Sequence, residues 1–416
     1  MITISDETKP NGWVKHVILF LVSQAITLFG SAIVQMAMIW HVALDTSSGL
    51  WVTLLTLSAY LPQMIISFFS GAWADRLPRK KLIVAADLGI AGATLVLALA
   101  MISGRSTEIL PFIILVSIIR SLGSGIQTPA VNALLPQLVP EEHLIRLNSL
   151  NSSVQSVVQF AAPLAAGVML RFGPISNILL VDVVTAVIGV AILMFVKVSV
   201  PAAGQEEQPE QLLTEIKAGI RYVLHDKQIF RILLTFGIFI FFSVPSGFLA
   251  VLMIERTFGA AIHLLTIAEM AGFAGMVTGG LALGIWGGFK NRYKTLSVGL
   301  LGYAVCSVCL GLAGDFRLFS MMLFLISVAI PVVQSSAMTL LQENTEPAVL
   351  GRVFGLMNVM YTGFMPLGMA VFGPLADFIR IQSMVIACSG ILLLLALTAM
   401  AVSTKEIRAG KEMPVS

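Results

Sequence analysis

Charged residues are scarce in this sequence. Aspartate, glutamate, lysine and arginine together make up only 11% of the 416 residues, whereas hydrophobic residues make up 57%. An ordinary soluble domain carries about 25% charged residues, so this composition excludes a soluble globular protein. The apolar residues are spread along the whole length of the chain rather than gathered in one anchor segment. The membrane is therefore expected to be the main solvent of the chain.

The sequence also lacks the short motifs of enzymes and nucleotide-driven pumps. It has no G-x-x-x-x-G-K-[ST] loop to hold nucleotide phosphates and no H-E-x-x-H zinc motif, and it has no G-x-S-x-G nucleophile turn. The three cysteines, Cys306, Cys309 and Cys388, include one C-x-x-C without a second pair, which indicates packing rather than a metal or redox site. We expect no enzyme activity and no cofactor, only a proton gradient as energy source.

Twelve apolar runs are long enough to cross a bilayer, which takes about 20 helical residues. The runs are continuous rather than alternating in polarity, so we expect helices and not the strands of a barrel. The first run lacks the A-x-A exit of a signal peptide and is expected to be the first span. The expected spans are 17–42, 51–73, 82–102, 110–133, 150–170, 175–196, 229–253, 264–287, 295–313, 317–340, 352–374 and 383–403.

The distribution of cations predicts the orientation of these spans. With a cytoplasmic N-terminus, 19 of the 25 lysines and arginines fall in inner segments, and Arg120 remains inside a span. Only five lie in outer loops, namely Arg105, Arg171, Arg256, Arg317 and Arg380. Adding or removing one span would erase this bias, which therefore supports a multi-pass protein of the cell (inner) membrane with both termini cytoplasmic. The net charge of +3 forms no basic face, so we expect no nucleic-acid partner.

The chain also repeats itself. The stretch "GAWADRLPRKK" at 71 aligns with "GIWGGFKNRYK" at 284, and "FAAPLAAGV" at 160 is similar to "GFMPLGMAV" at 363. Duplicated halves are common in transporters. We expect one six-helix bundle over 1–196 and a second over 229–416, with a cytoplasmic linker at 197–228 that contains an amphipathic helix.

The repeat and the charged loop after the second span resemble the major facilitator superfamily along essentially the whole chain. The loop has the form G-x-x-x-D-R-x-x-R-K-K, with Pro78 in place of the usual second glycine. The segments "SQAITLFGSAIVQMAMIWHV", "NALLPQLVPEEHLIRLNSLNSSVQ" and "AGIRYVLHDKQIFRILL" are similar to the macrolide-efflux branch of drug exporters. The resemblance implies an all-α fold of two six-helix bundles that works by alternating access.

The charged loop has two possible roles. Its cations fix it on the cytoplasmic side, which could be its whole purpose. Alternatively, Asp75 at the end of span two could face the N-terminus of span eleven, where unpaired N–H groups favour an anion. The resemblance implies that such a contact latches the two halves. The candidate gating residues are Gly71, Asp75, Arg76, Arg79 and Lys80.

Ionisable residues inside spans are few, and each is a candidate functional residue. An arginine in mid-membrane, such as Arg120 in span four, costs at least about 2.5–3.5 kcal/mol. Its stretch resembles the family's R-x-x-x-G motif, which implies a part in proton coupling; a buried arginine satisfied by Gln24 is the alternative. Asp182 and Glu269 are expected about 8–10 Å below the outer surface, where they could take up an external proton. Asp87, about one turn from the charged loop, is interpreted as an interfacial acid.

Residues for a substrate cavity are less clearly indicated. Phe239 and Phe242 in "FGIFIFFSV" could line a cavity for a bulky apolar compound, although aromatic residues in a membrane helix often face lipid. Gln24 and Gln35 in span one are further candidates. The glycines of span eight, from Gly272 to Gly288, indicate a close helix–helix seam.

These features together predict a secondary exporter of small amphipathic compounds, with macrolide-like drugs implied by the resemblance and proton antiport as the energy source. The expected partners are that substrate and membrane lipids, and we expect a monomer. An exporter of an endogenous metabolite such as a siderophore would share every feature. An importer or lipid flippase would differ in the direction of flux, and a non-transporting receptor or scaffold would have no need of ionisable residues within the bilayer.

Overall fold

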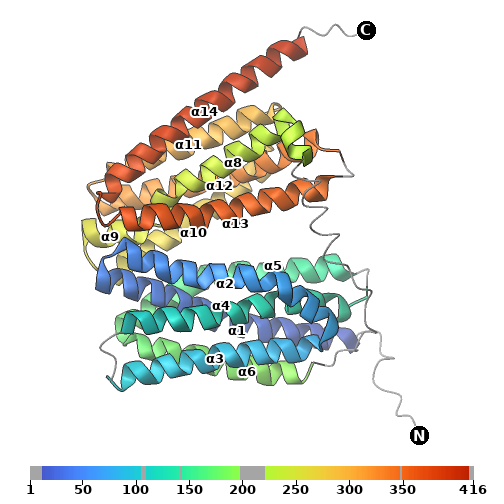
Figure 1. The fold of residues 1–416 in the computed structure, drawn as a ribbon, viewed down its shortest axis with the longest axis vertical. Helices are drawn as coiled ribbons and strands as arrows, with labels where there is room; N and C mark the ends of the chain where they lie inside the picture. The colour runs from blue at the N-terminus through green and yellow to red at the C-terminus, as the bar shows by residue number, and fades with distance from the viewer. Residues whose placement is uncertain (1–11, 105–108, 141–142, 197–220, 347–348, 412–416) are drawn as a thin grey trace. The chain divides into compact units, whose positions relative to one another are not determined.

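The computed structural model describes residues 12–104, 109–140, 143–196, 221–346 and 349–411, which are helical apart from short turns (Figure 1). Twelve of the helical segments are long and apolar enough to cross a membrane. The twelve-span prediction is therefore confirmed, and most boundaries lie within a few residues of the expected ones.

Among the described residues, the first half of the chain has six long helices and one 3₁₀ turn. They are α1 (Gly12–Thr46), α2 (Gly49–Arg76), α3 (Arg79–Ile102), α4 (Ile109–Leu134), η2 (Leu135–Gln137), α5 (Leu144–Phe172) and α6 (Ile175–Met194). The second half holds α8 (Lys227–Gly247), α9 (Ala250–Phe258), α10 (Ile262–Trp286), α11 (Arg292–Gly311), α12 (Phe316–Asn344), α13 (Leu350–Leu375) and α14 (Ile381–Lys411).

Two expectations about boundaries changed. The seventh span is interrupted near Gly247, so that α8 and α9 share it. Pro245 lies just before this break, and a proline inside a helix removes one backbone hydrogen bond. The linker helix expected between 197 and 228 lies mostly outside the described residues; residues 221–225 are helical, and Val223 among them is buried.

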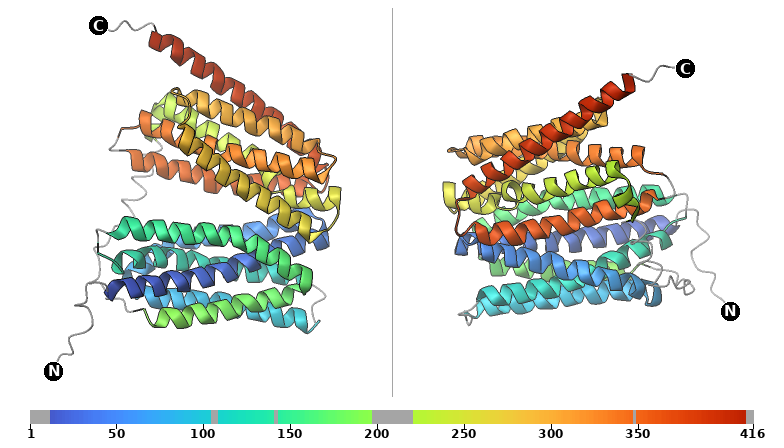
Figure 2. Two further views of the ribbon diagram at one scale, coloured as in Figure 1. Left: turned by 180° about the vertical axis from the view of Figure 1, so that it is seen from behind. Right: turned by 45° about the horizontal axis from the view of Figure 1, so that its top comes forward.

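The chain divides into two compact units. Unit 1 comprises residues 1–46 and 54–206, and unit 2 comprises residues 47–53 and 207–416. Within unit 1, α1 packs on α5 and α6, and α3 packs on α4 and α6 (Figure 2). Within unit 2, α12 packs on α10 and α11, α11 on α14, and α8 on α13.

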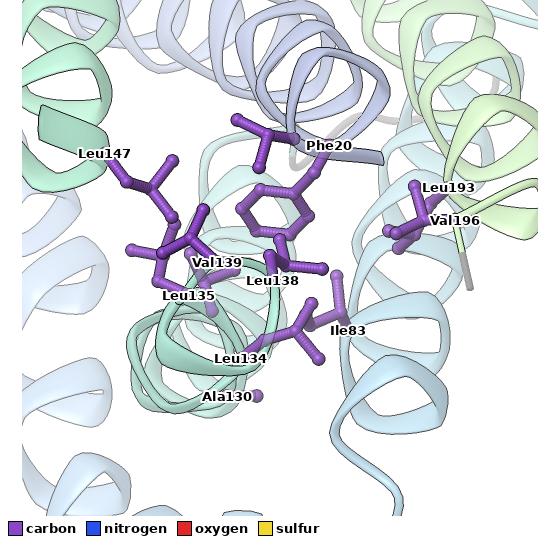
Figure 3. Packing of buried hydrophobic residues seen from close by; sticks show 12 residues of the cluster. Phe20, Ile83, Ala130, Leu134, Leu135, Leu138, Val139, Leu147, Leu193 and Val196 are labelled. Carbon is purple, nitrogen blue, oxygen red and sulfur yellow. The ribbon is translucent and has the colours of Figure 1, made fainter. Parts of the chain in front are cut away.

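A cluster of apolar side chains lies within unit 1 (Figure 3). Phe20, Ile83 and Leu134, which come from the third turn of α1, the second turn of α3 and the last turn of α4, are completely buried in it. The remaining labelled members are Ala130, Leu135, Leu138, Val139, Leu147, Leu193 and Val196. Burial of a leucine or phenylalanine side chain contributes about 1.5–3 kcal/mol to folding stability. The cluster therefore stabilises the packing of five helices, α1, α3, α4, α5 and α6.

The glycine-rich seam expected in span eight is present on one side of α10. A Cβ atom added at Gly275 would lie 2.2 Å from the carbonyl oxygen of Phe324, and one at Gly279 would lie 2.2 Å from that of Val328. Both acceptors belong to α12, so these two glycines let the helix backbones approach closely. Gly280 and Gly284 have no other atom within 4 Å of such a Cβ and do not take part in this contact.

Unit 2 also contains the start of α2, because residues 47–53 pack there. The carboxylate of Asp377 accepts hydrogen bonds from the backbone N–H groups of Gly49 (2.7 Å) and Leu50 (3.0 Å) and from the hydroxyl of Ser48 (2.8 Å). Arg256 donates to the same carboxylate at 2.9 Å. The aspartate therefore caps a helix from a distant part of the sequence.

Partial burial alone would raise the pKa of Asp377, but the hydrogen bonds from the two N–H groups, the hydroxyl and the guanidinium outweigh that effect. They hold the pKa of Asp377 below its usual value because each of them stabilises the ionised carboxylate.

Candidate functional site

The centre of unit 1 contains a buried ion pair. Arg120 of α4 and Asp182 of α6 are 5% and 1% exposed, and Nη1 of Arg120 donates to Oδ2 of Asp182. This pair is buried, whereas the pairs His41–Asp45, Arg256–Asp377 and Arg292–Glu343 are at least one-quarter exposed on one partner. Both residues were predicted as coupling sites, but nothing in the sequence indicated that they would pair.

Two hydroxyl groups complete the surroundings of the Asp182 carboxylate. Ser31 of α1 donates to Oδ1 at 3.0 Å, and Thr94 of α3 donates to Oδ2 at 3.0 Å. Arg120 also donates to the hydroxyl of Thr94 and, at 3.4 Å, to the carbonyl oxygen of Ser31. Four helices thus meet at one carboxylate, which is paired and hydrogen-bonded as a buried charge requires.

These hydroxyls can also serve a neutral carboxyl group, because a hydroxyl both donates and accepts. Thr94 lies 2.9 Å from the carbonyl oxygen of Ile90, so its proton has a second acceptor within its own helix. Nε of Arg120 is buried and has no partner among the described residues. The hydroxyl of Thr94 therefore has two acceptors, the carboxylate in α6 and a carbonyl oxygen in its own helix.

Close packing of α1 on α6 brings Ser31 to the carboxylate. A Cβ atom at Gly30 would lie only 1.9 Å from Oγ1 of Thr185, so any side chain there would push the two helices apart. One turn before Ser31, Thr27 lies against Gly189 in the same way, and Ser23 donates to the carbonyl oxygen of Gly189 at 2.8 Å. The glycines thus hold the donor of α1 at hydrogen-bond distance.

The helix that carries Arg120 is fixed against α2 by its next residue. The hydroxyl of Ser121 donates to the carbonyl oxygen of Ala59 (2.7 Å) and accepts from the N–H of Gln63 (2.9 Å), two groups one helical turn apart. The Ser121 hydroxyl thereby bridges two backbone groups of α2 next to Pro62. This bridge fixes the depth of Arg120 within unit 1.

Glu269, the other predicted proton site, lies in α10 of unit 2. It is half-buried and has no hydrogen bond or ion pair with any residue that the structure describes. The residues described therefore provide a paired carboxylate in unit 1 and an unpaired one in unit 2.

The loop residues Arg79 and Lys80 donate hydrogen bonds to backbone carbonyl oxygens within unit 1. Arg79 donates from Nη1 to the carbonyl oxygen of Ala133 at 2.6 Å. Lys80 donates to the carbonyl oxygens of Met194 (2.7 Å) and Val196 (2.9 Å), at the C-terminal end of α6, where a cation is favoured by the helix dipole.

The other three gating candidates, Gly71, Asp75 and Arg76, lie within α2, but their side chains fall outside the described residues. The contact expected between Asp75 and the start of span eleven stays a prediction.

The predicted cavity residues lie at separate places. Gln24 is 2% exposed, and Gln35 is half-buried; Nε2 of each is buried without a partner among the residues described. Among the described residues, Arg120 donates to Thr94, Asp182 and the carbonyl oxygen of Ser31, and not to Gln24. Phe239 packs edge-on against Tyr303 with ring centres 5.0 Å apart, and Phe242 packs near Phe241 and Phe372.

A surface cavity of about 280 Å³ in unit 2 is lined by α8, α11 and α14. The predicted cavity residues Gln24, Gln35, Phe239 and Phe242 do not line it. Its lining includes Arg231, Thr235, Ile238, Tyr293, Leu296 and Thr398. Pockets for drug-sized ligands run from about 300 to 1,000 Å³, so this cavity lies just below that range.

The expectation for Asp87 was wrong. It is 4% exposed rather than interfacial, and its Oδ1 accepts a hydrogen bond from Nε2 of Gln127 at 2.6 Å. Its position was judged from its distance along α3 to the charged loop, whereas its burial depends on which side of α3 faces α4. Thr94 and Ser31 were missed entirely, because a hydroxyl in a span is common and carries no signal of its partner.

Twelve helices long and apolar enough to cross a membrane define a multi-pass membrane protein, and no three His, Cys, Asp or Glu side chains gather for a metal ion in the part of the chain that the structure describes. The sequence model of the Major Facilitator Superfamily matches residues 20–368 and again 232–412, so the chain belongs to that family, whose members are membrane transporters and not enzymes.

Two of its relatives are efflux proteins. Macrolide efflux protein A of Streptococcus pyogenes is 30% identical over 379 residues, which cover 90% of this chain and 92% of that protein. The multidrug efflux pump Tap of Mycobacterium bovis is 21% identical over 370 residues, which cover 86% of each chain.

Solved structures support the fold. A bacterial homologue of the iron transporter ferroportin in an inward-facing state matches with a TM-score of 0.71 at 16% identity, covering 93% of this chain and 98% of that one. A bacterial homologue of the human lysosomal transporter Spinster matches with a TM-score of 0.67 at 14% identity, covering 95% and 98%. At these identities the likeness is one of fold alone.

Proposed function

We propose that this chain exports amphipathic, macrolide-like compounds from the cytoplasm or inner leaflet in exchange for protons, with the Arg120–Asp182 pair as the coupling site. Support for the substrate class comes from the 30% identity to macrolide efflux protein A over 90% of the chain. Support for the coupling site comes from the one observation that carries the proposal: a carboxylate, 1% exposed, held by one guanidinium and two hydroxyls.

Coupling follows from what a proton does to this pair. When Asp182 is ionised, it attracts Arg120 and so links α6 to α4, which both pack on α3, in a medium of low dielectric constant, where charge pairs interact strongly. When Asp182 binds a proton from outside, that attraction is lost, and the hydroxyls of Ser31 and Thr94 can turn to serve the neutral group. The packing of α4 and α6 on α3 then has two states, and proton binding selects between them.

The proton gradient is large enough to drive this selection. One charge that moves through 100 mV releases about 2.3 kcal/mol, to which a pH difference adds. A free energy of this size biases a two-state equilibrium by more than about tenfold. Substrate export needs no other energy source on this chain.

The proposal is tested by drug accumulation in energised cells. Cells that express the wild type should accumulate less radiolabelled macrolide and less cationic dye than empty cells, and a protonophore should remove the difference. Asp182→Asn should lose the difference at equal membrane expression. Glu343→Gln, which alters an exposed acid, is the matched control and should behave as wild type.

The outcomes separate the alternatives. Loss of export with Glu269→Gln but not with Asp182→Asn would move the coupling site to unit 2. Wild-type cells that accumulate as much macrolide and dye as empty cells would refute the drug-export proposal and favour an endogenous substrate. Export that persists with the protonophore would refute proton coupling.

A further inference from the structure

The contact between α3 and α4 contains polar residues at regular intervals. Thr94 of α3 meets Arg120 of α4, and Asp87 of α3 meets Gln127 of α4. In each helix the two residues are seven positions apart, which is two turns, so they lie on the same side and about 10 Å apart along the helix axis. A second polar contact thus lies directly along the helices from the ion pair, toward the end where Arg79 meets the carbonyl oxygen of Ala133.

Asp87 is surrounded differently from Asp182. Gln127 gives it one neutral donor, at 2.6 Å to Oδ1, and Oδ2 is buried with no hydrogen-bond partner among the described residues. An ionised Asp87 would be a buried charge, 4% exposed, without a counter-ion. A neutral carboxylic acid at the same place costs much less, so the surroundings suit a carboxyl group that holds a proton.

The charged groups that face Asp87 from neighbouring helices are already paired. Arg120 of α4 lies two turns away and is engaged with Asp182 of α6. Within α3, Arg79 and Lys80 are two turns away in the other direction and donate to backbone carbonyl oxygens. No cation among these is available to Asp87 as a partner.

An apolar layer separates Asp87 from the nearer end of unit 1. Ile83 lies one turn before Asp87 in α3, and Ala130 and Leu134 follow Gln127 in α4; all three are buried in the cluster of Figure 3. Apolar side chains offer water no hydrogen-bond partner, so this layer disfavours water between Asp87 and the charged loop. A proton that leaves Asp87 toward the charged loop therefore has to pass this layer.

We propose that Asp87 and Gln127 form a second proton-binding site, which receives the proton released by Asp182 and passes it on toward the charged loop. The inference rests on the proposed proton coupling. In the transfer, the O–H bond at Asp182 breaks and its carboxylate pairs with Arg120 again, while a new O–H bond forms at Asp87. The distance of about 10 Å exceeds a hydrogen bond, so water molecules must bridge the two sites. In the structure the Arg120–Asp182 ion pair is formed, and the surroundings of Asp87 suit a carboxyl group that holds a proton. This is the arrangement expected after the transfer.

Infrared spectroscopy of the purified full-length protein tests the proton itself. The wild type at neutral pH should show the C=O stretching band of a protonated carboxylic acid that disappears in Asp87→Asn. Gln127→Leu should shift the frequency of that band, because the amide that binds Oδ1 is gone. A spectrum in which Asp87→Asn loses no band would overturn the inference.

Transport by proteoliposomes tests the relay. We compare uptake of radiolabelled macrolide driven by an imposed pH difference with exchange of labelled for unlabelled macrolide, which needs no net proton movement. The ratio of pH-driven uptake to exchange should fall at least about tenfold in Asp87→Asn, and Asp87→Glu should restore it. Glu343→Gln should leave the ratio as in wild type.

The infrared and proteoliposome experiments together distinguish failure of this inference from failure of the proposed function. A normal ratio in Asp87→Asn beside a coupled wild type would overturn the relay alone. A wild type with no pH-driven uptake would refute the proposed proton coupling and the relay with it, and the infrared band would still decide whether Asp87 holds a proton.

Discussion

Removal of Arg120 gives the sharpest test of how the ion pair contributes to the fold. The variant Arg120→Met keeps the length and the apolar stem of the side chain but leaves the Asp182 carboxylate with only the hydroxyls of Ser31 and Thr94. Because that carboxylate is 1% exposed, it cannot recover its lost partner from water. Breaking one side of a buried pair costs about 3–5 kcal/mol, or about 6–20 °C in Tm for a bundle of this size.

The double variant Arg120→Met, Asp182→Asn has no buried charge, so it should regain most of that loss. The interaction energy from the double-mutant cycle should then lie near the upper end of the usual range, at about 2–3 kcal/mol. Thermal unfolding of the four purified proteins in one detergent measures it. An Arg120→Met protein with the wild-type Tm, or a double variant that loses the sum of the two single losses, would refute the reasoning.

Three further predictions concern packing and pH. Gly30→Ala should lower stability by about 1–3 kcal/mol because its Cβ would meet Thr185, whereas Gly89→Ala, with no atom within 4 Å, should be neutral or slightly stabilising; equal Tm shifts would contradict this. Phe20→Ala should cost about 3–5 kcal/mol because this side chain is wholly buried, and a loss under about 1 kcal/mol would show that the apolar cluster contributes little. The lowered pKa of Asp377 means that its ionised form stabilises the fold above the unfolded-state pKa of about 3.9, and this contribution is lost as the pH falls through the folded-state value. The Tm difference between wild type and Asp377→Asn should therefore be largest at neutral pH and close on strong acidification, and a constant difference would count against the cap.

The spans could be predicted from the sequence because each of them is a local property. A continuous apolar run and its flanking cations fix a membrane helix without reference to the rest of the chain. The break between α8 and α9 was missed because apolar residues continue through it, and hydropathy carries no information about the backbone.

The ion pair could be predicted only in part. Arg120 and Asp182 were singled out because charge is expensive in a span. Their pairing joins residues 62 positions apart and depends on how α4 and α6 both pack on α3 and on the close approach of α1 to α6 that Gly30 permits. Neither quantity is contained in the pattern of one helix.

The charged loop and Asp87 show the same limit. Arg79 and Lys80 were expected at the membrane surface, but their acceptors lie 54 and 114 residues away in the sequence, so the carbonyl contacts could not be foreseen. Asp87 was placed by its depth along α3, while Gln127, the residue that accommodates it, belongs to another helix. Depth follows from the sequence of one span, but the neighbours on each face follow from tertiary packing.

The central claim is that substrate export and proton entry are one process that passes through Asp182. Its most direct measurement is proton movement in proteoliposomes that hold purified protein and a pH-sensitive dye, after a macrolide is added on one side. Wild-type protein should move protons in the direction opposite to the macrolide, and Asp182→Asn should move none. Macrolide transport by the wild type without any proton movement, or unchanged proton movement in Asp182→Asn, would contradict the account.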